Sequence, residues 1–84
     1  MNKMTQEMAL RGAVAAELRS HMARGGVTQE QLAKMIGTTG PVVNRYMTGK
    51  RDIPMRTMVA MCDALGVDTG RVIDDAIAAT HRTH

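Results

Sequence analysis

Three polar side chains, Asn44, Arg45 and Thr48, are spaced so that they can share one face of a helix. An arginine can bind a guanine edge through two hydrogen bonds, and an asparagine can pair with adenine or with a phosphate. Gly40 and Pro41 precede them on the same face, and residues this small allow a close approach of the backbone to a ligand. Such a face suits the major groove of DNA. The alternative interpretation is a helix face that is simply solvated.

Positive charge is concentrated in the same part of the chain. Residues 31–62 contain five lysines and arginines but only one acidic residue, Asp52, whereas residues 63–84 contain two arginines and four aspartates. The net charge of the whole chain is only +3, which is common in any soluble domain. The distribution of the charge therefore says more than its total. The basic residues of the middle segment are Lys34, Arg45, Lys50, Arg51 and Arg56.

No other group of reactive side chains predicts an active site. Cys62 lies among apolar residues at helical spacing, where a buried thiol is ordinary, and no histidine and acid accompany it at the spacing of a nucleophile. Asp74 and Asp75 are adjacent, so on a helix they diverge and cannot act as a catalytic pair. The histidines would bind a metal only if the fold brought them together. We therefore expect no enzymatic activity, no cofactor and no metal site; the three histidines are His21, His81 and His84.

The elements that must position these residues are short helices. Alanine and methionine are abundant and Tyr46 is the only aromatic residue, which favours helices over a sheet. The first helix is predicted from about 4 to 24, the fourth from Pro54 to Gly66, and the fifth from its cap Asp68 to about Thr80, followed by a frayed tail over 81–84. The predicted apolar stripes are Leu10, Val14, Leu18 and Met22, then Met55, Met58, Val59, Cys62 and Leu65, then Val72, Ile73, Ala76 and Ile77, with Met35 as a further core methionine.

Between the first and fourth helices, two very short helices with a tight turn are predicted from Thr28 to Thr48. Thr28 begins a T-x-x-Q capping box, and Gly37 suits the end of that helix. Thr39 can cap the next helix, which carries a proline in its first turn. A pair of helices joined in this way is the geometry that places the second helix in the major groove of DNA. The residues expected to face the core from that helix are Val43, Tyr46 and Met47.

The segment TQEQLAKMIGTTGPVVNRYMTGKR, followed by MVAMCDALGV, resembles the phage repressor and Cro family of Xre-like helix-turn-helix proteins. The matching features are T-Q, L-A, the glycine that ends the second helix, an apolar-x-x-Tyr pattern, G-K-R and A-L-G-V. The resemblance covers roughly Leu18 to Ile77. It implies an all-α, five-helix, lambda-repressor-like fold whose third helix reads double-stranded DNA, often as a dimer on a roughly palindromic operator with half-sites about 34 Å apart.

The resemblance also implies roles for individual residues. Gln29, at the start of the second helix, matches a position that contacts a phosphate, where the partial positive charge of the helix end helps. Lys50 and Arg51 match a loop that lies along the phosphates, and Arg45 is our first choice for contact with a base. The full set of predicted DNA-binding residues is Gln29, Thr38, Thr39, Gly40, Pro41, Asn44, Arg45, Thr48, Lys50 and Arg51.

Two departures from the family pattern bear on this prediction. Gly40 and Pro41 stand where relatives commonly carry glutamine or serine side chains that bond to bases, so sequence readout would rest more on other residues and on DNA deformability. Met47 stands where relatives often carry a glutamate that pairs with a basic residue at the place of Met22. Because two apolar groups can replace a buried ion pair, we predict that Met22 and Met47 touch.

The predicted function is that of a dimeric transcriptional repressor or Cro-like regulator, formed by a single domain over 1–84 with its core at about 10–80. One cysteine allows no internal disulfide, and the longest apolar run, Met58–Cys62, is far shorter than the roughly 20 residues that span a bilayer, so we expect a cytoplasmic, nucleoid-associated protein. A second hypothesis is an antitoxin-like protein that mainly binds another protein. The predicted dimer surface is Val67, Val72, Ile73 and Ile77, with Met1 to Leu10 as the alternative.

Overall fold

The structure is a computed structural model that describes the backbone of residues 3–82 and the side chains of residues 6–82. Within these residues the chain forms five α-helices and no β-strand, which confirms the predicted all-α fold. No helix in that range is long and apolar enough to cross a membrane. The helices are α1 (Lys3–Gly25), α2 (Gln29–Ile36), α3 (Gly40–Met47), α4 (Met55–Leu65) and α5 (Thr69–Arg82).

Short-range signals determine where several of these helices begin and end. Gly37 and Gly66 end α2 and α4 in the left-handed conformation, with φ of 77° and 70°, which glycine adopts without the strain of a Cβ atom. At the start of α5, the carboxylate of Asp68 accepts a hydrogen bond of 2.9 Å from the backbone N–H of Arg71. This bond confirms the predicted cap, because it satisfies one of the N–H groups that have no partner inside the helix.

Side chains from all five helices form one hydrophobic core. Leu18 of α1, Leu32 of α2, Met47 of α3, Met61 of α4 and Val72 of α5 are each fully buried. With one aromatic side chain available, methionines fill much of this core, and their flexible unbranched chains suit irregular spaces. The buried apolar residues are Ala15, Leu18, Met22, Leu32, Ala33, Val43, Tyr46, Met47, Met58, Met61, Cys62, Val72 and Ala76.

The buried faces of α4 and α2 match the predicted ones only in part; Met58 and Cys62 of the predicted α4 stripe are buried. In α4, Met55 and Val59 are exposed, whereas Met61, outside the predicted stripe, is fully buried. Methionine recurs every three residues in α4, so periodicity alone allowed two faces, and packing against α1, α2 and α5 selects the face that contains Met61. Met35 of α2 is 57% exposed, so its prediction as a core residue is wrong. The reason is that α2 packs through the face of Leu32 instead.

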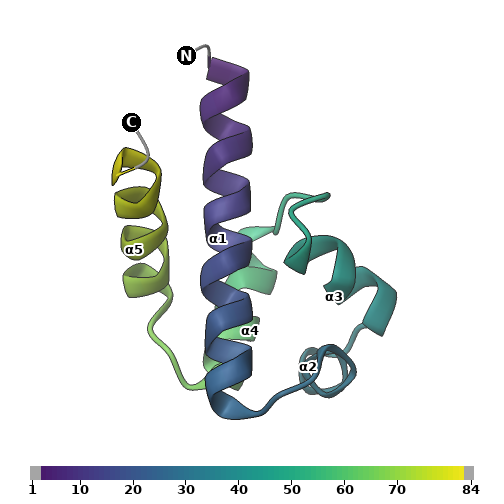
Figure 1. Cartoon of the computed structure of the whole chain (residues 1–84). Helices are drawn as coiled ribbons and strands as arrows, with labels where there is room; N and C mark the ends of the chain where they lie inside the picture. Colours follow the sequence, from purple (N-terminus) through teal and green to yellow (C-terminus); the bar gives the residue numbers. More distant parts are fainter. Residues whose placement is uncertain (1–2, 83–84) are drawn as a thin grey trace.

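The fifth helix packs alongside α1, antiparallel to it (Figure 1). Val72, predicted as a dimer residue, is fully buried within the single chain, so that prediction is corrected: α1 covers this part of the α5 stripe. Ile73 and Val67 are half-buried against the same core, and Ile77 is exposed. The helix continues through Arg82, which includes two residues of the predicted frayed tail; residues 83 and 84 lie outside the described range.

Figure 1 shows that α1 separates two regions of the molecule. The helices α2 and α3 lie together on one side of α1, and α5 lies on the other. Direct packing joins α2 to α3 and α1 to α5, while α4 contacts α1, α2 and α5. Half of the ten predicted DNA-binding residues lie in these two helices, namely Gln29 in α2 and Gly40, Pro41, Asn44 and Arg45 in α3. The others lie in the turn between the helices, Thr38 and Thr39, or directly after α3, Thr48, Lys50 and Arg51.

Candidate nucleic-acid interface

Two reciprocal hydrogen bonds define the start of α2. The Thr28 hydroxyl accepts from the backbone N–H of Gln31 at 3.1 Å, and the Gln31 side-chain carbonyl accepts from the backbone N–H of Thr28 at 2.9 Å. This is the predicted capping box. It makes Gln29 the first residue of α2, at a helix end whose unpaired N–H groups carry a partial positive charge.

The third helix turns one face inward and presents the opposite face to solvent. It begins after Thr39 with a proline in its first turn, as predicted, although the Thr39 side chain makes no capping hydrogen bond. Its buried residues confirm the predicted inward face: Val43, Tyr46 and Met47. The fold therefore brings the predicted outward residues onto one surface, where Gly40 is half-buried and the rest are exposed: Pro41, Asn44, Arg45 and Thr48.

An arginine of α1 holds the C-terminal end of α3. The guanidinium of Arg19 donates a hydrogen bond to the backbone carbonyl of Met47, and the last carbonyls of a helix lack partners inside it. A cation at that end also stabilises the helix dipole. Met22, one turn further along α1, is buried in the same core as Met47, as the predicted contact between them requires. Sequence reasoning missed Arg19; its position three residues before Met22 was the available signal.

A side-chain hydrogen bond joins the exposed faces of α2 and α3. The Nδ2 atom of Asn44 donates to the Oε1 atom of Gln29 at 3.1 Å. Both residues were predicted to contact DNA, but their contact with each other was not predicted, because they lie 15 residues apart on different helices. The structure thus makes one paired unit of two separately predicted residues.

The loop after α3 is tied back to that helix. The Thr48 hydroxyl donates to the backbone carbonyl of Asn44 at 2.9 Å, which helps to close the last turn. The guanidinium carbon of Arg51 lies 5.7 Å from the centroid of the Tyr46 ring, within the range of a cation–π interaction. Lys50 lies beside it and is exposed. Arg51 is therefore held near the C-terminal end of α3, and Lys50 is an exposed cation in the same loop.

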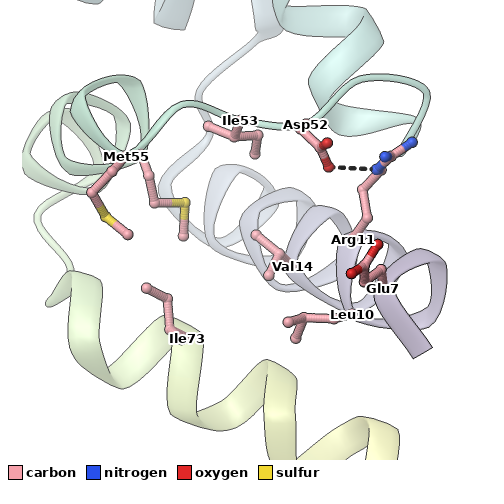
Figure 2. Close-up of a pocket in the computed structure, with 9 residues that line it drawn as sticks. Glu7, Leu10, Arg11, Val14, Asp52, Ile53, Met55 and Ile73 are labelled. Atoms are coloured by element: carbon pink, nitrogen blue, oxygen red, sulfur yellow. Dashed lines mark hydrogen bonds and ion pairs between the residues drawn. The ribbon is translucent and has the colours of Figure 1, made fainter. Parts of the chain in front are cut away.

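The single acidic residue of the basic segment is paired with α1. The Nε atom of Arg11 lies 2.7 Å from Oδ1 of Asp52, as the dashed line in Figure 2 shows. Both side chains reach solvent, so the pair contributes little to stability. Its effect is on the local charge: the guanidinium of Arg11 offsets the Asp52 carboxylate, which therefore counts less against Lys50 and Arg51 of the same loop.

A second surface feature, an apolar groove of about 570 Å³, lies between α5, the start of α4 and the N-terminal half of α1 (Figure 2). The Arg11–Asp52 pair lies at its rim, and Leu10 and Ile73 line it from opposite helices. Leu10 belongs to one of the two alternative dimer surfaces predicted from the sequence and Ile73 to the other, so these surfaces meet at the groove; residues 1 and 2 of the first surface lie outside the described range. Its lining residues are Glu7, Leu10, Arg11, Val14, Asp52, Ile53, Met55, Met58 and Ile73.

The chemistry of Cys62 fits a packing role. The side chain is fully buried in the core, and burial raises the pKa of its thiol, with a smaller opposing effect from a hydrogen bond with Thr69. A raised pKa keeps the thiol protonated at neutral pH, and the thiolate is the reactive form. Within the described residues, no three His, Cys, Asp or Glu side chains gather in a way that could hold a metal ion.

Comparisons with known proteins agree with this geometry. A family model described as a helix-turn-helix domain matches residues 13–75. A crystal structure of the clp gene regulator ClgR from C. glutamicum aligns with a TM-score of 0.78 and 28% sequence identity over 83% of this chain and 91% of that chain. A second structure of ClgR from Corynebacterium glutamicum aligns with a TM-score of 0.83 and 27% identity over 88% of this chain and 79% of that one. No curated protein sequence matches the chain.

Proposed function

The chain belongs to the family of helix-turn-helix domains, DNA-binding regulators rather than enzymes, and from this premise we propose that it is a dimeric, sequence-specific transcriptional repressor. The observation that carries the proposal is the outward face of α3, which is polar, basic and free of bulky apolar side chains. The structural neighbour ClgR is a regulator of clp genes, and this supports a role in transcription for the present chain. Repression follows if the bound protein excludes polymerase from a promoter.

In the proposed complex, α3 lies in the major groove and α2 crosses the DNA backbone. Arg45 contacts a base edge, while Gln29, Lys50 and Arg51 contact phosphates. Phosphate contacts set the position of the protein on the duplex, and base contacts supply sequence preference. The half-buried Thr38 and the N-cap Thr39 lie at the entry to α3, close to where a backbone phosphate would pass. The proposed DNA-binding residues are Gln29, Thr38, Thr39, Gly40, Pro41, Asn44, Arg45, Thr48, Lys50 and Arg51.

We place the dimer contact on the side of α1 away from α3, along the groove of Figure 2. Leu10 and Ile77 are partly exposed apolar residues on this side, and Ile73 lines the groove, whereas Val72 is excluded by its burial. A twofold dimer would present two copies of α3 to half-sites about 34 Å apart on a roughly palindromic operator. Light scattering at micromolar concentration tests this point, and a monomer there would count against it.

We further propose that residues from about 10 to 80 act as one folding unit, because all five helices contribute to one core. The N-terminal part of α1 before Leu10 extends beyond that core. A single cooperative unfolding transition, seen equally by circular dichroism and by Tyr46 fluorescence, is the expected result. Two separate transitions would contradict it.

A binding-site selection on random double-stranded DNA tests the proposed function. The expected result is an enriched site with twofold symmetry, and binding to it that weakens steeply as salt rises, because phosphate contacts release counterions. A titration with the purified site by fluorescence anisotropy gives the affinity. The absence of any enriched sequence, together with salt-insensitive binding, would refute a role as a sequence-specific repressor.

A further inference from the structure

The hydrogen bond between Gln29 and Asn44 leaves different hydrogen-bonding groups free on the two side-chain amides. We propose that Asn44 reads an adenine in the major groove, and that Gln29 positions Asn44 while binding the neighbouring phosphate. The inference rests on the proposed function, since it needs α3 to lie in the groove. It adds the base that Asn44 contacts and the positioning of Asn44 by Gln29, neither of which the proposed function specifies.

The hydrogen-bonding groups left on Asn44 match adenine. A carboxamide has two N–H donors and one carbonyl acceptor, and one donor of Asn44 is already bonded to Oε1 of Gln29 at 3.1 Å. One N–H and the Oδ1 oxygen remain. In the major groove adenine offers one acceptor, N7, beside one donor, the N6 amino group. Guanine offers two acceptors, cytosine one donor, and thymine one acceptor and a methyl group.

The groups left on Gln29 match a phosphate. Its Oε1 atom already accepts from Asn44, so the Nε2 group remains with its two donors. Gln29 is also the first residue of α2, where the helix end carries partial positive charge. A phosphate oxygen only accepts hydrogen bonds. If Asn44 contacted the phosphate instead, its remaining Oδ1 oxygen would lie close to an anion, which is unfavourable.

The surroundings of Asn44 favour a contact between its side chain and a base. Gly40 lies one turn before Asn44 on the same face of α3. Because Gly40 has no side chain, position 40 places nothing between Asn44 and a base. A Cβ atom at position 40 would lie 3.4 Å from the Cγ atom of Glu30, so α2 already occupies that space. The bond to Gln29 also orders the Asn44 side chain before DNA arrives, which lowers the entropy cost of binding.

Replacement of single atoms in the DNA tests this inference. Each adenine of the selected site is replaced in turn by 7-deazaadenine, which lacks the N7 acceptor, and binding of the full chain is measured by fluorescence anisotropy. At one adenine per half-site, we expect the replacement to weaken wild-type binding about tenfold, within the usual range for a bidentate contact. The same replacement should cost Asn44→Ala nothing further. Gln29→Ala should weaken binding to all sites and reduce the penalty at that adenine.

Arg45→Ala is the matched control, because it removes a neighbouring outward side chain and should leave the penalty at that adenine intact. Circular dichroism checks that each variant folds. If Asn44→Ala keeps the full penalty at every adenine, or weakens all sequences equally, Asn44 contacts the backbone and the inference is overturned. A wild-type protein that selects no site at all is a different result, which overturns the proposed function and this inference with it.

Discussion

The two sides of α1 are built in different ways. On the side of α2 and α3, hydrogen bonds between residues close in sequence define the helices, as in the capping box of Thr28 and the left-handed Gly37. On the side of α5, a long helix is held mainly by apolar packing through Val72 and Ala76, and an apolar groove remains. The first side is defined by its local sequence, whereas the second depends on which distant residues pack against it.

The two sides of α1 also differ in their exposed charges. The α3 side exposes the cations Arg45, Lys50 and Arg51, and its one nearby aspartate is paired with α1. On α5, Asp74 and Asp75 are exposed. Arg71 and Arg82 of α5 balance these two carboxylates in charge, so an anionic partner is attracted to the α3 side and not to α5. The difference supports the proposal that DNA binds on one side of the molecule and that a second protein chain binds on the other.

The largest expected effect comes from the core that both sides share. Leu18→Ala removes a fully buried side chain of α1 and should lower the free energy of unfolding by about 2–5 kcal/mol, measured by urea denaturation. Leu10→Ala, eight residues earlier on α1, is the control: its side chain is 36% exposed, so we expect a clearly smaller loss of stability but a larger monomer fraction. Equal destabilisation by both variants would contradict the described packing of α1.

The next effect separates base contacts from phosphate contacts on the α3 side. Arg45→Ala should relax base preference at one position of the selected site, at a cost of about 1–3 kcal/mol in binding. Lys50→Ala should weaken binding to all sequences and lower the slope of affinity against salt by about 1, because it removes one phosphate contact. Repeated site selection and salt titrations measure both. Equal losses on every sequence from both variants would refute the role of Arg45.

Two threonines at corresponding helix starts provide a smaller and sharper test. Thr28→Ala removes the hydroxyl of the capping box and should lower the free energy of unfolding by about 0.5–2 kcal/mol. Thr39→Ala removes a hydroxyl that makes no capping hydrogen bond, so stability should change little. Chemical denaturation of both variants gives the comparison. A larger loss from Thr39→Ala than from Thr28→Ala would show that the start of α3 is capped differently.

The smallest effect concerns Cys62. Because burial raises the pKa of its thiol, iodoacetamide at pH 8 should leave the folded protein almost unmodified and should modify the protein in urea rapidly. Mass spectrometry over time measures the modified fraction. Modification of the folded protein at the rate seen in urea would mean that the core on the α4 side opens readily.

The sequence predicted the side of α2 and α3 better than the other side. Thr28, Gln31 and Gly37 act through bonds within a few residues, so their types and spacing were sufficient. Met61 and Val72 could not be assigned in this way, because periodicity identifies apolar stripes but not which neighbouring helix covers them. Periodicity also misplaced Met35, which is exposed.

Within the candidate site, sequence reasoning could identify residues but not their mutual contacts. Gln29 and Asn44 were both predicted, yet the hydrogen bond between them depends on how α2 and α3 cross. The same holds for Arg19, which reaches the end of α3 from α1. Long side chains that act between helices become visible only when the helices are placed in space.

The central claim is that DNA binds to the side of α2 and α3, and NMR of the labelled chain tests it most directly. Backbone amide shifts are followed while the selected DNA site is added. We expect the largest changes at residues 28–31 and 38–51, with smaller changes in the outer part of α5. Changes confined to α5 and the N-terminal half of α1, with the amides of α3 unaffected, would contradict the account.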